Sequence, residues 1–322
     1  MERERAESLS AHDLSADPEM ALVRATEAVA LACGALVGKG DQERARELAA
    51  GAMLDALEEM PQGARVTITP QGEGVLSSGS LVGGSTYVHD LALYPVEGAG
   101  LVARGLPNAL SIICAVPAGG FPGLPAVAYV DKMVVGPAAR GAVDLDDPVA
   151  DNLRRIAFSR DVRVADLTVA ILDRPRHQEL VEEVRASGAR ILSLEDGDIA
   201  AAIMAAMDGT GIDAMLGVGG LQEAVVAAAA VRALGGDLQC RLWPRNDEER
   251  ILAGSDLERT FSAIELVPAE VTVAATGITA GPLLRGVWFG SGWAETDSIL
   301  MSTRRATVRR LSTRHHRIGG TA

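Results

Sequence analysis

The sequence has few aromatic residues and few cysteines, and each shortage limits the class of protein it can be. Aromatic residues form 3% of the 322 residues while hydrophobic residues form 48%, so the core must consist mainly of small aliphatic side chains. Such a composition, with 35 glycines available for turns, is typical of layered α/β packing. The three cysteines, Cys33, Cys114 and Cys240, lack metal-binding or disulfide-framework spacing, which favours a reducing compartment.

The chain also lacks long apolar segments and a surplus of positive charge. No apolar stretch reaches the roughly 18–20 residues that a membrane span needs, and the start MERERAESLS lacks a signal-peptide hydrophobic block. A net charge of -13 argues against a surface for nucleic acid or anionic membranes. We therefore expect a cytoplasmic protein with neither partner, in which the arginine-rich segment 302–317 is a solvated strand and tail.

Hydrophobic periodicity predicts two helices followed by a series of strands in the first part of the chain. Residues 1–18 are charged and aperiodic, which predicts a disordered tail. Apolar residues recur at helical spacing over 19–37, and Asp41 is placed to cap a second helix that runs to about residue 60. Alternating or apolar runs then predict strands at 65–69, 86–93, 110–116 and 127–135.

The rhythm of the sequence changes after Pro148, where helices alternate with short apolar strands. This alternation predicts a parallel or mixed sheet with helices on its faces, and a boundary near residues 137–148. The expected helices are 149–158, 178–186, 199–207 and 222–234, and the expected strands are 167–172, 190–194, 214–218 and 271–275.

Nine short motifs follow one another in an order that one known family shares. They are Gly38-Lys39-Gly40-Asp41, Tyr94-Pro95-Val96-Glu97-Gly98, Asn108-Ala109-Leu110, Tyr129 with Lys132-Met133-Val134-Val135-Gly136-Pro137, Ala150-Asp151-Asn152-Leu153-Arg154, Arg174-Pro175-Arg176-His177, Asp196-Gly197-Asp198, Gly219-Gly220-Leu221-Gln222-Glu223 and Ala275-Thr276-Gly277-Ile278-Thr279. Together they resemble the class II fructose-1,6-bisphosphatases of bacteria, part of the lithium-sensitive phosphatase superfamily. The resemblance runs from about residue 19 to about residue 312.

This resemblance implies an α/β fold, a layered α/β/α/β/α sandwich of the sugar phosphatase type. It divides the chain into a metal-site half at 19–140 and a sugar-phosphate-binding half with a mixed sheet at 141–322. It further implies a phosphorylated sugar as ligand and a homo-oligomer, either a dimer or a tetramer. In the family, two or three divalent ions activate a water that attacks the 1-phosphate, so Mg²⁺ or Mn²⁺ is implied if hydrolysis is retained.

The resemblance assigns catalytic and metal-binding roles to Glu97 and Glu223, and a metal-binding role to Glu73 if its loop aligns with an insertion and a deletion. A gapless alignment instead places Thr69 at that position. Without the resemblance, Glu97 and Glu223 would be interpreted as surface carboxylates.

Three metal-side positions depart from the family pattern. Tyr94 stands where the family has a metal-bridging Asp, and one phenol oxygen is a poor substitute for a carboxylate. Ala99 stands where the family has a Thr that assists the attacking water, and Arg46 stands where a helix carries a metal-binding Asp. A guanidinium can replace a metal's charge but cannot activate a water.

The sugar side of the pattern is better preserved. The resemblance implies that Tyr129, Arg174, Arg176, Asp196 and Asp198 bind the sugar and its distal 6-phosphate, with Arg174 in place of the usual Lys. Guanidinium groups can fork onto phosphate oxygens, and carboxylates can accept from sugar hydroxyls. Taken alone, the Asp196-Gly197-Asp198 turn would be interpreted as a helix cap.

These observations lead to three functional hypotheses. The first is a phosphosugar-binding enzyme of this lineage, acting on a ketohexose phosphate or a similar sugar phosphate, with metal-dependent hydrolysis weakened or replaced by other chemistry. The second is an active Mg²⁺- or Mn²⁺-dependent fructose-1,6-bisphosphatase whose ligands are rearranged around Glu73, Asp90, Glu97 and Glu223. The third is an inactive regulatory subunit that completes an active paralogue.

Overall fold

The computed structural model describes residues 17–70, 74–123 and 125–316. The predicted tail, apart from its last two residues, lies outside the described residues. The helices are α2 (Pro18–Gly34), α3 (Gln42–Glu58), α4 (Ala99–Arg104), α5 (Val149–Ser159), α6 (Gln178–Ala186), α7 (Asp198–Ala206), α8 (Leu221–Leu234), α9 (Asp247–Ala253) and α10 (Ala263–Leu266).

The strands form two sheets. They are β1 (Gly63–Ile68), β2 (Leu81–Gly83), β3 (Tyr87–Glu97), β4 (Leu110–Pro117), β5 (Tyr129–Val135), β6 (Thr168–Leu172), β7 (Arg190–Leu194), β8 (Ala214–Gly220), β9 (Asp237–Leu242), β10 (Thr260–Ser262), β11 (Thr272–Gly277), β12 (Trp288–Gly290), β13 (Trp293–Ser302) and β14 (Thr307–His316).

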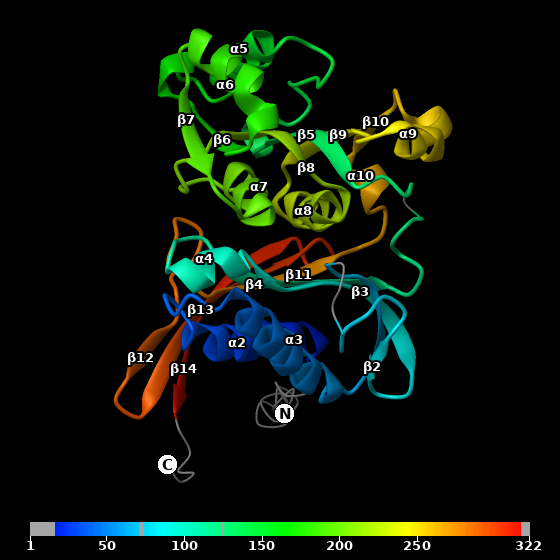
Figure 1. The fold of residues 1–322 in the computed structure, drawn as a ribbon, viewed down its shortest axis with the longest axis vertical. Helices are drawn as coiled ribbons and strands as arrows, with labels where there is room; N and C mark the ends of the chain where they lie inside the picture. Colours follow the sequence, from blue (N-terminus) through cyan, green and yellow to red (C-terminus); the bar gives the residue numbers. More distant parts are fainter. Residues whose placement is uncertain (1–16, 71–73, 124, 317–322) are drawn as a thin grey trace, which may run out of the picture.

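The elements stack in five layers, which confirms the α/β/α/β/α sandwich (Figure 1). Helices α5 and α6 cover one sheet, α7 and α8 lie between the two sheets, and α2 and α3 cover the outer face of the other sheet. Three hydrophobic clusters fill the spaces between the layers: one lies around α7 and α8 between the two sheets, and one lies under each outer pair of helices. No helix in the described parts of the chain combines the length and the apolar character that a membrane crossing requires.

The first sheet combines strands from the early and the late parts of the chain. Its strand order is β12-β13-β11-β4-β3-β1-β2, with β14 paired to β13. Strand β11 pairs with β4 through Thr272 opposite Ala115, so a late strand lies in the centre of an early sheet. The two sheets therefore do not separate at residue 140, because only β5 to β10 form the second sheet.

The second sheet is mixed, with the order β10-β9-β5-β8-β6-β7. Strands β6, β7 and β8 are parallel, whereas β5 runs antiparallel to β8. The carboxyl ends of the three parallel strands and the start of β5 consequently meet at one edge of the sheet. This arrangement places the loops after β6, β7 and β8 beside one another.

Sequence patterns found the major helices to within a few residues. Asp41 caps α3 as predicted, because its side chain accepts a hydrogen bond from the Arg44 amide at 2.9 Å. The arginine-rich segment forms β14, whose side chains are exposed or half-buried, in agreement with the solvated strand. The patterns missed strand β9, the β12–β13 hairpin, the edge strands β2 and β10, and the short helices α4, α9 and α10.

The two central helices explain the shortage of large aromatic residues. Every residue of α7 is buried, and most of α8 is buried as well. A helix that is apolar on all sides must be enclosed by other elements. Small alanine side chains let α7 and α8 pack together between two sheets.

Substitution of Ile203, which is fully buried in α7, tests this central layer. Ile203→Ala should lower the free energy of unfolding by about 2–5 kcal/mol, because it removes apolar contacts and leaves a cavity. Ile251→Ala in the exposed part of α9 is the matched control and should change the unfolding free energy by less than about 0.5 kcal/mol. Urea denaturation measures both; equal effects would contradict the enclosed packing of α7.

Candidate functional site

A cavity of about 300 Å³ lies where the two sheets approach each other. Seven of the eight residues that the sequence assigns to a site line it: Glu97, Tyr129, Arg174, Arg176, Asp196, Asp198 and Glu223. The eighth, Glu73, lies outside the described residues. The structure therefore gathers residues that span more than a hundred sequence positions into a single cavity.

The topology of the second sheet explains this gathering. Arg174 and Arg176 follow β6, Asp196 and Asp198 follow β7, and Glu223 follows β8. In open α/β sheets the loops at the carboxyl ends of parallel strands form the usual ligand crevice.

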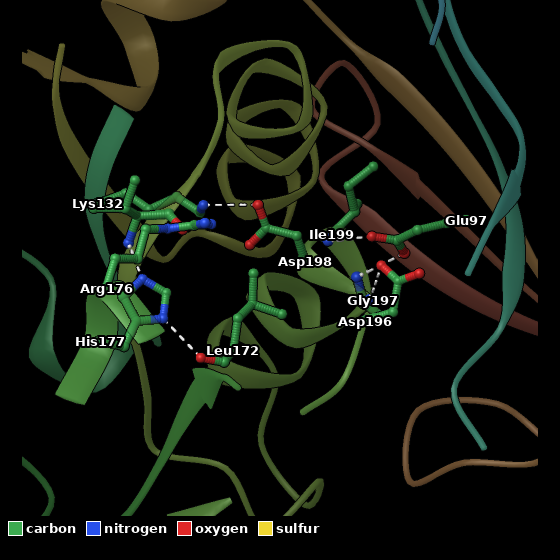
Figure 2. Close-up of polar contacts among 11 residues, drawn as sticks. Glu97, Lys132, Leu172, Arg176, His177, Asp196, Gly197, Asp198 and Ile199 are labelled. Atoms are coloured by element: carbon green, nitrogen blue, oxygen red, sulfur yellow. Dashed lines mark hydrogen bonds and ion pairs between the residues drawn. The ribbon is translucent and has the colours of Figure 1, made fainter. Parts of the chain in front are cut away.

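Glu97 reaches this cavity from the other sheet and holds the N-terminus of α7. It ends β3 just after a register shift between Tyr94 and Glu97, at Pro95, which has no amide hydrogen to donate to β4. Its carboxylate accepts hydrogen bonds from the amides of Ile199 and Ala200, the latter at 3.0 Å (Figure 2). Burial raises the pKa of Glu97, although the two amide donors oppose that shift.

Asp198 forms a buried ion pair in the same cavity. The Lys132 ammonium donates to its Oδ2 atom at 2.8 Å, and the lysine side chain is 1% exposed (Figure 2). The other carboxylate oxygen of Asp198 is buried without a hydrogen-bond partner among the described residues. A Cβ atom at Gly219 would lie 2.0 Å from Asp198 Oδ2, so only glycine permits this close approach.

Asp196 lies two residues before Asp198, in the loop that leads into α7. Its Oδ1 atom accepts from the Gly197 amide at 2.9 Å (Figure 2). Gly197 adopts a left-handed backbone (φ 94°), which turns the chain from β7 into α7 and directs both carboxylates to the cavity.

The cationic side of the cavity consists of two arginines. Arg176 donates through Nη2 to the Val218 carbonyl at 2.8 Å, and its guanidinium carbon lies 5.2 Å from the Tyr129 ring centroid. Arg174 donates to the neighbouring Asp173 carbonyl at 2.8 Å. Neither guanidinium is paired with a carboxylate among the described residues, so both can offer hydrogens to an anion.

His177 lies between the ends of two neighbouring strands, beside Arg176. The Val218 amide donates to Nε2 at 2.8 Å, so the neutral ring carries its hydrogen on Nδ1 and donates to the Leu172 carbonyl at 2.7 Å (Figure 2). Burial lowers the pKa of His177, which favours this neutral form. The ring thus bridges the ends of β6 and β8, where direct strand pairing has stopped.

The metal side of the cavity carries a phenol and a guanidinium. Tyr94 is 4% exposed, and its hydroxyl has no well-aligned hydrogen-bond partner in the described parts of the chain. Burial and the adjacent Glu223 carboxylate raise the pKa of Tyr94, so the phenol stays protonated. Arg46 and Ala99 also line the cavity.

The described side chains of the cavity do not by themselves fit a site for two divalent ions. Both oxygens of Glu97 accept amide hydrogens, and Lys132 pairs with Asp198. Burial raises the pKa of Glu223, so its negatively charged form is less favoured than that of an exposed glutamate. Across residues 17–70, 74–123 and 125–316, no group of three His, Cys, Asp or Glu side chains is arranged to hold a metal ion.

Asp90 does not lie in this cavity, which corrects its inclusion among rearranged ligands. It is 1% exposed and accepts hydrogen bonds from Tyr87 at 2.5 Å, Arg65 at 3.1 Å and the Gly119 amide at 2.6 Å. Burial raises its pKa, but these donors outweigh burial and hold the pKa below its usual value. Asp90 is a structural carboxylate that joins β3 to its neighbours.

Sequence reasoning assigned no role to two residues that shape the cavity. Lys132 carried a signal, because it is one of only two lysines and lies, next to Asp131, in the mainly apolar strand β5. His177 carried none, because its two backbone partners come from different strands.

Comparison with known proteins places the chain in a family. Residues 17–315 match the family described as bacterial fructose-1,6-bisphosphatase, glpX-encoded. The chain is 36% identical to the D-fructose 1,6-bisphosphatase class 2/sedoheptulose 1,7-bisphosphatase of Synechococcus sp. (strain JA-3-3Ab), over 92% of this chain and 95% of that protein. It is 35% identical to the fructose-1,6-bisphosphatase class 2 of Haemophilus influenzae, over 91% and 94% of the two chains. The chain therefore belongs to the bacterial class 2 fructose-1,6-bisphosphatase family.

Proposed function

We propose that this protein binds a phosphorylated ketose in the cavity and that metal-dependent hydrolysis of the phosphate ester is weakened or replaced by other chemistry. The observation that carries the proposal is the asymmetry of the cavity. The sugar side presents cations and an unpartnered carboxylate oxygen, whereas the metal side presents a phenol, a guanidinium and a carboxylate already engaged by two amides.

The sugar side has the chemistry that a sugar phosphate requires. Arg174 and Arg176 would hold the distal phosphate through paired N–H donors, beside the Tyr129 ring. Asp196 and Asp198 would accept from sugar hydroxyls, and the buried unpartnered oxygen of Asp198 gains a donor in this way. The related proteins are named for fructose 1,6- and sedoheptulose 1,7-bisphosphates, which supports a ketose bisphosphate as the ligand.

Few side chains in the cavity remain available for catalysis. Glu223 accepts no amide hydrogen from another described residue, whereas Glu97 is engaged by two amides and holds α7. The buried phenol of Tyr94 can donate a hydrogen bond to a sugar or phosphate oxygen, but it cannot bridge two ions.

A second candidate is an active Mg²⁺- or Mn²⁺-dependent bisphosphatase, which family membership favours. It would need Glu73, outside the described residues, to complete a site with Glu97 and Glu223. The third hypothesis, an inactive partner of an active paralogue, predicts that a related chain with an intact family turn co-purifies. We further propose a cytoplasmic homo-oligomer, a dimer or tetramer, on the family resemblance.

Calorimetry with fructose 1,6-bisphosphate tests the binding proposal. The dissociation constant should be the same within about twofold in EDTA and in Mg²⁺, because the sugar side contains its own cations. Arg176→Gln should raise the dissociation constant at least about tenfold, since it removes charge-assisted hydrogen bonds. Arg163→Gln, at an exposed arginine paired with Asp166, is the matched control and should change nothing. Absence of wild-type binding, or binding only with Mg²⁺, would contradict the proposal.

Replacing the three altered residues by those of the family pattern tests whether they limit metal-dependent hydrolysis. The triple variant Arg46→Asp, Tyr94→Asp and Ala99→Thr should increase Mg²⁺- or Mn²⁺-dependent phosphate release from fructose 1,6-bisphosphate at least about tenfold, because it restores ligands and a hydroxyl. The same variant with Glu223→Gln is the control and should lose the gain. A wild-type rate already as high as that of the Haemophilus influenzae relative, assayed alongside, would instead establish the second candidate.

A further inference from the structure

The ring of Tyr129 is contacted by two guanidinium groups from different parts of the chain. Arg176, which follows β6, has its guanidinium carbon 5.2 Å from the ring centroid, and Arg245, which follows β9, has its own at 5.7 Å. The Trp243 ring meets the Tyr129 ring edge-on at 6.4 Å between centroids. Guanidinium groups within about 6 Å of an aromatic centroid are attracted by the ring's electron density.

Arg245 itself does not line the sugar cavity, whereas Tyr129 and Arg176 do. Its side chain donates through Nε to Glu249 Oε1 at 2.7 Å, and its backbone amide donates to Glu249 Oε2 at 2.9 Å. Glu249 is 6% exposed, and Asn246 accepts a hydrogen bond from the Glu249 amide at the start of α9. The charge of Arg245 is therefore neutralised, and its position is fixed by the loop that leads into α9.

A neutralised guanidinium outside the cavity contributes little direct attraction to a bound anion. It can still fix the orientation of the ring, because the guanidinium packs on Tyr129 while hydrogen bonds to Glu249 hold it in position. The backbone supports the same contact, since the Trp243 amide donates to the Tyr129 carbonyl at 2.9 Å. The ring in turn packs against Arg176, whose guanidinium faces the cavity.

We infer that Arg245 is a positioning residue for the distal phosphate: it holds the Tyr129 ring, and through the ring it holds Arg176. The inference rests on the proposed function, since it assigns Arg176 to a sugar phosphate. A lysine at position 245 would keep the charge but lose the planar surface and the forked donors. Charge alone therefore does not substitute for the arginine.

Fructose 6-phosphate and fructose 1-phosphate separate this role from a general structural one. Arg245→Lys should raise the dissociation constant of fructose 6-phosphate about twofold to fivefold and leave that of fructose 1-phosphate unchanged. Arg259→Lys is the matched control, because Arg259 also packs on a ring, Phe261 at 4.6 Å, and pairs with a carboxylate, Glu265 at 2.8 Å, away from the cavity. Arg259→Lys should change neither constant.

A double-mutant cycle tests whether the effect passes through the ring. In a Tyr129→Leu background, Arg245→Lys should cause no further weakening of fructose 6-phosphate binding. Each of three results would overturn the inference while leaving the proposed function intact. Arg245→Lys could weaken fructose 6-phosphate binding as much in the Tyr129→Leu background as in the wild type, it could leave that binding unchanged in the wild type, or it could weaken the binding of both monophosphates equally. If the wild-type protein binds none of the three ligands, neither of the two monophosphates nor the bisphosphate, the proposed function is overturned, and the inference with it.

Discussion

The carboxylate of Glu97 connects the first sheet to the central helix α7 beside the cavity. It comes from β3 in the first sheet and accepts the amides of Ile199 and Ala200 at the start of α7, which lies between the sheets. The first amides of a helix have no partners within the helix and carry its positive dipole end, so a carboxylate there satisfies both needs. The position of α7, and with it that of Asp198, depends on this contact.

The buried pair of Lys132 and Asp198 continues the same constraint into the second sheet. Removing one member of a buried ion pair leaves an uncompensated charge, so the two groups fix each other. Gly219 provides the space for their contact, since any larger residue would occupy it. The His177 ring lies between the ends of β6 and β8, and Arg176 donates to the Val218 carbonyl at the same place. Cavity-lining groups from the loops after β6, β7 and β8 are thereby held in place by buried polar contacts.

The differences on the metal side change what this frame can hold. A protonated phenol at Tyr94 and a guanidinium at Arg46 stand among carboxylates, so the cavity already contains its own hydrogen-bond donors and positive charge. Divalent ions need several free oxygen anions arranged around them. Family membership therefore describes the ancestry and fold of the chain, whereas the donor set describes its local chemistry.

The sequence by itself determined the α/β character of the chain through its hydrophobic periodicity, and the family through the order of its motifs. The five-layer sandwich and seven of the residues that line the cavity then followed from the resemblance to that family. Only the tertiary structure decided how those groups are used. It showed that Glu97 is engaged by amides about a hundred positions away, that Asp90 lies elsewhere with its own donors, and that the last strands join the first sheet. Each of these depends on contacts between distant segments, and such contacts leave no periodic or local pattern in the sequence.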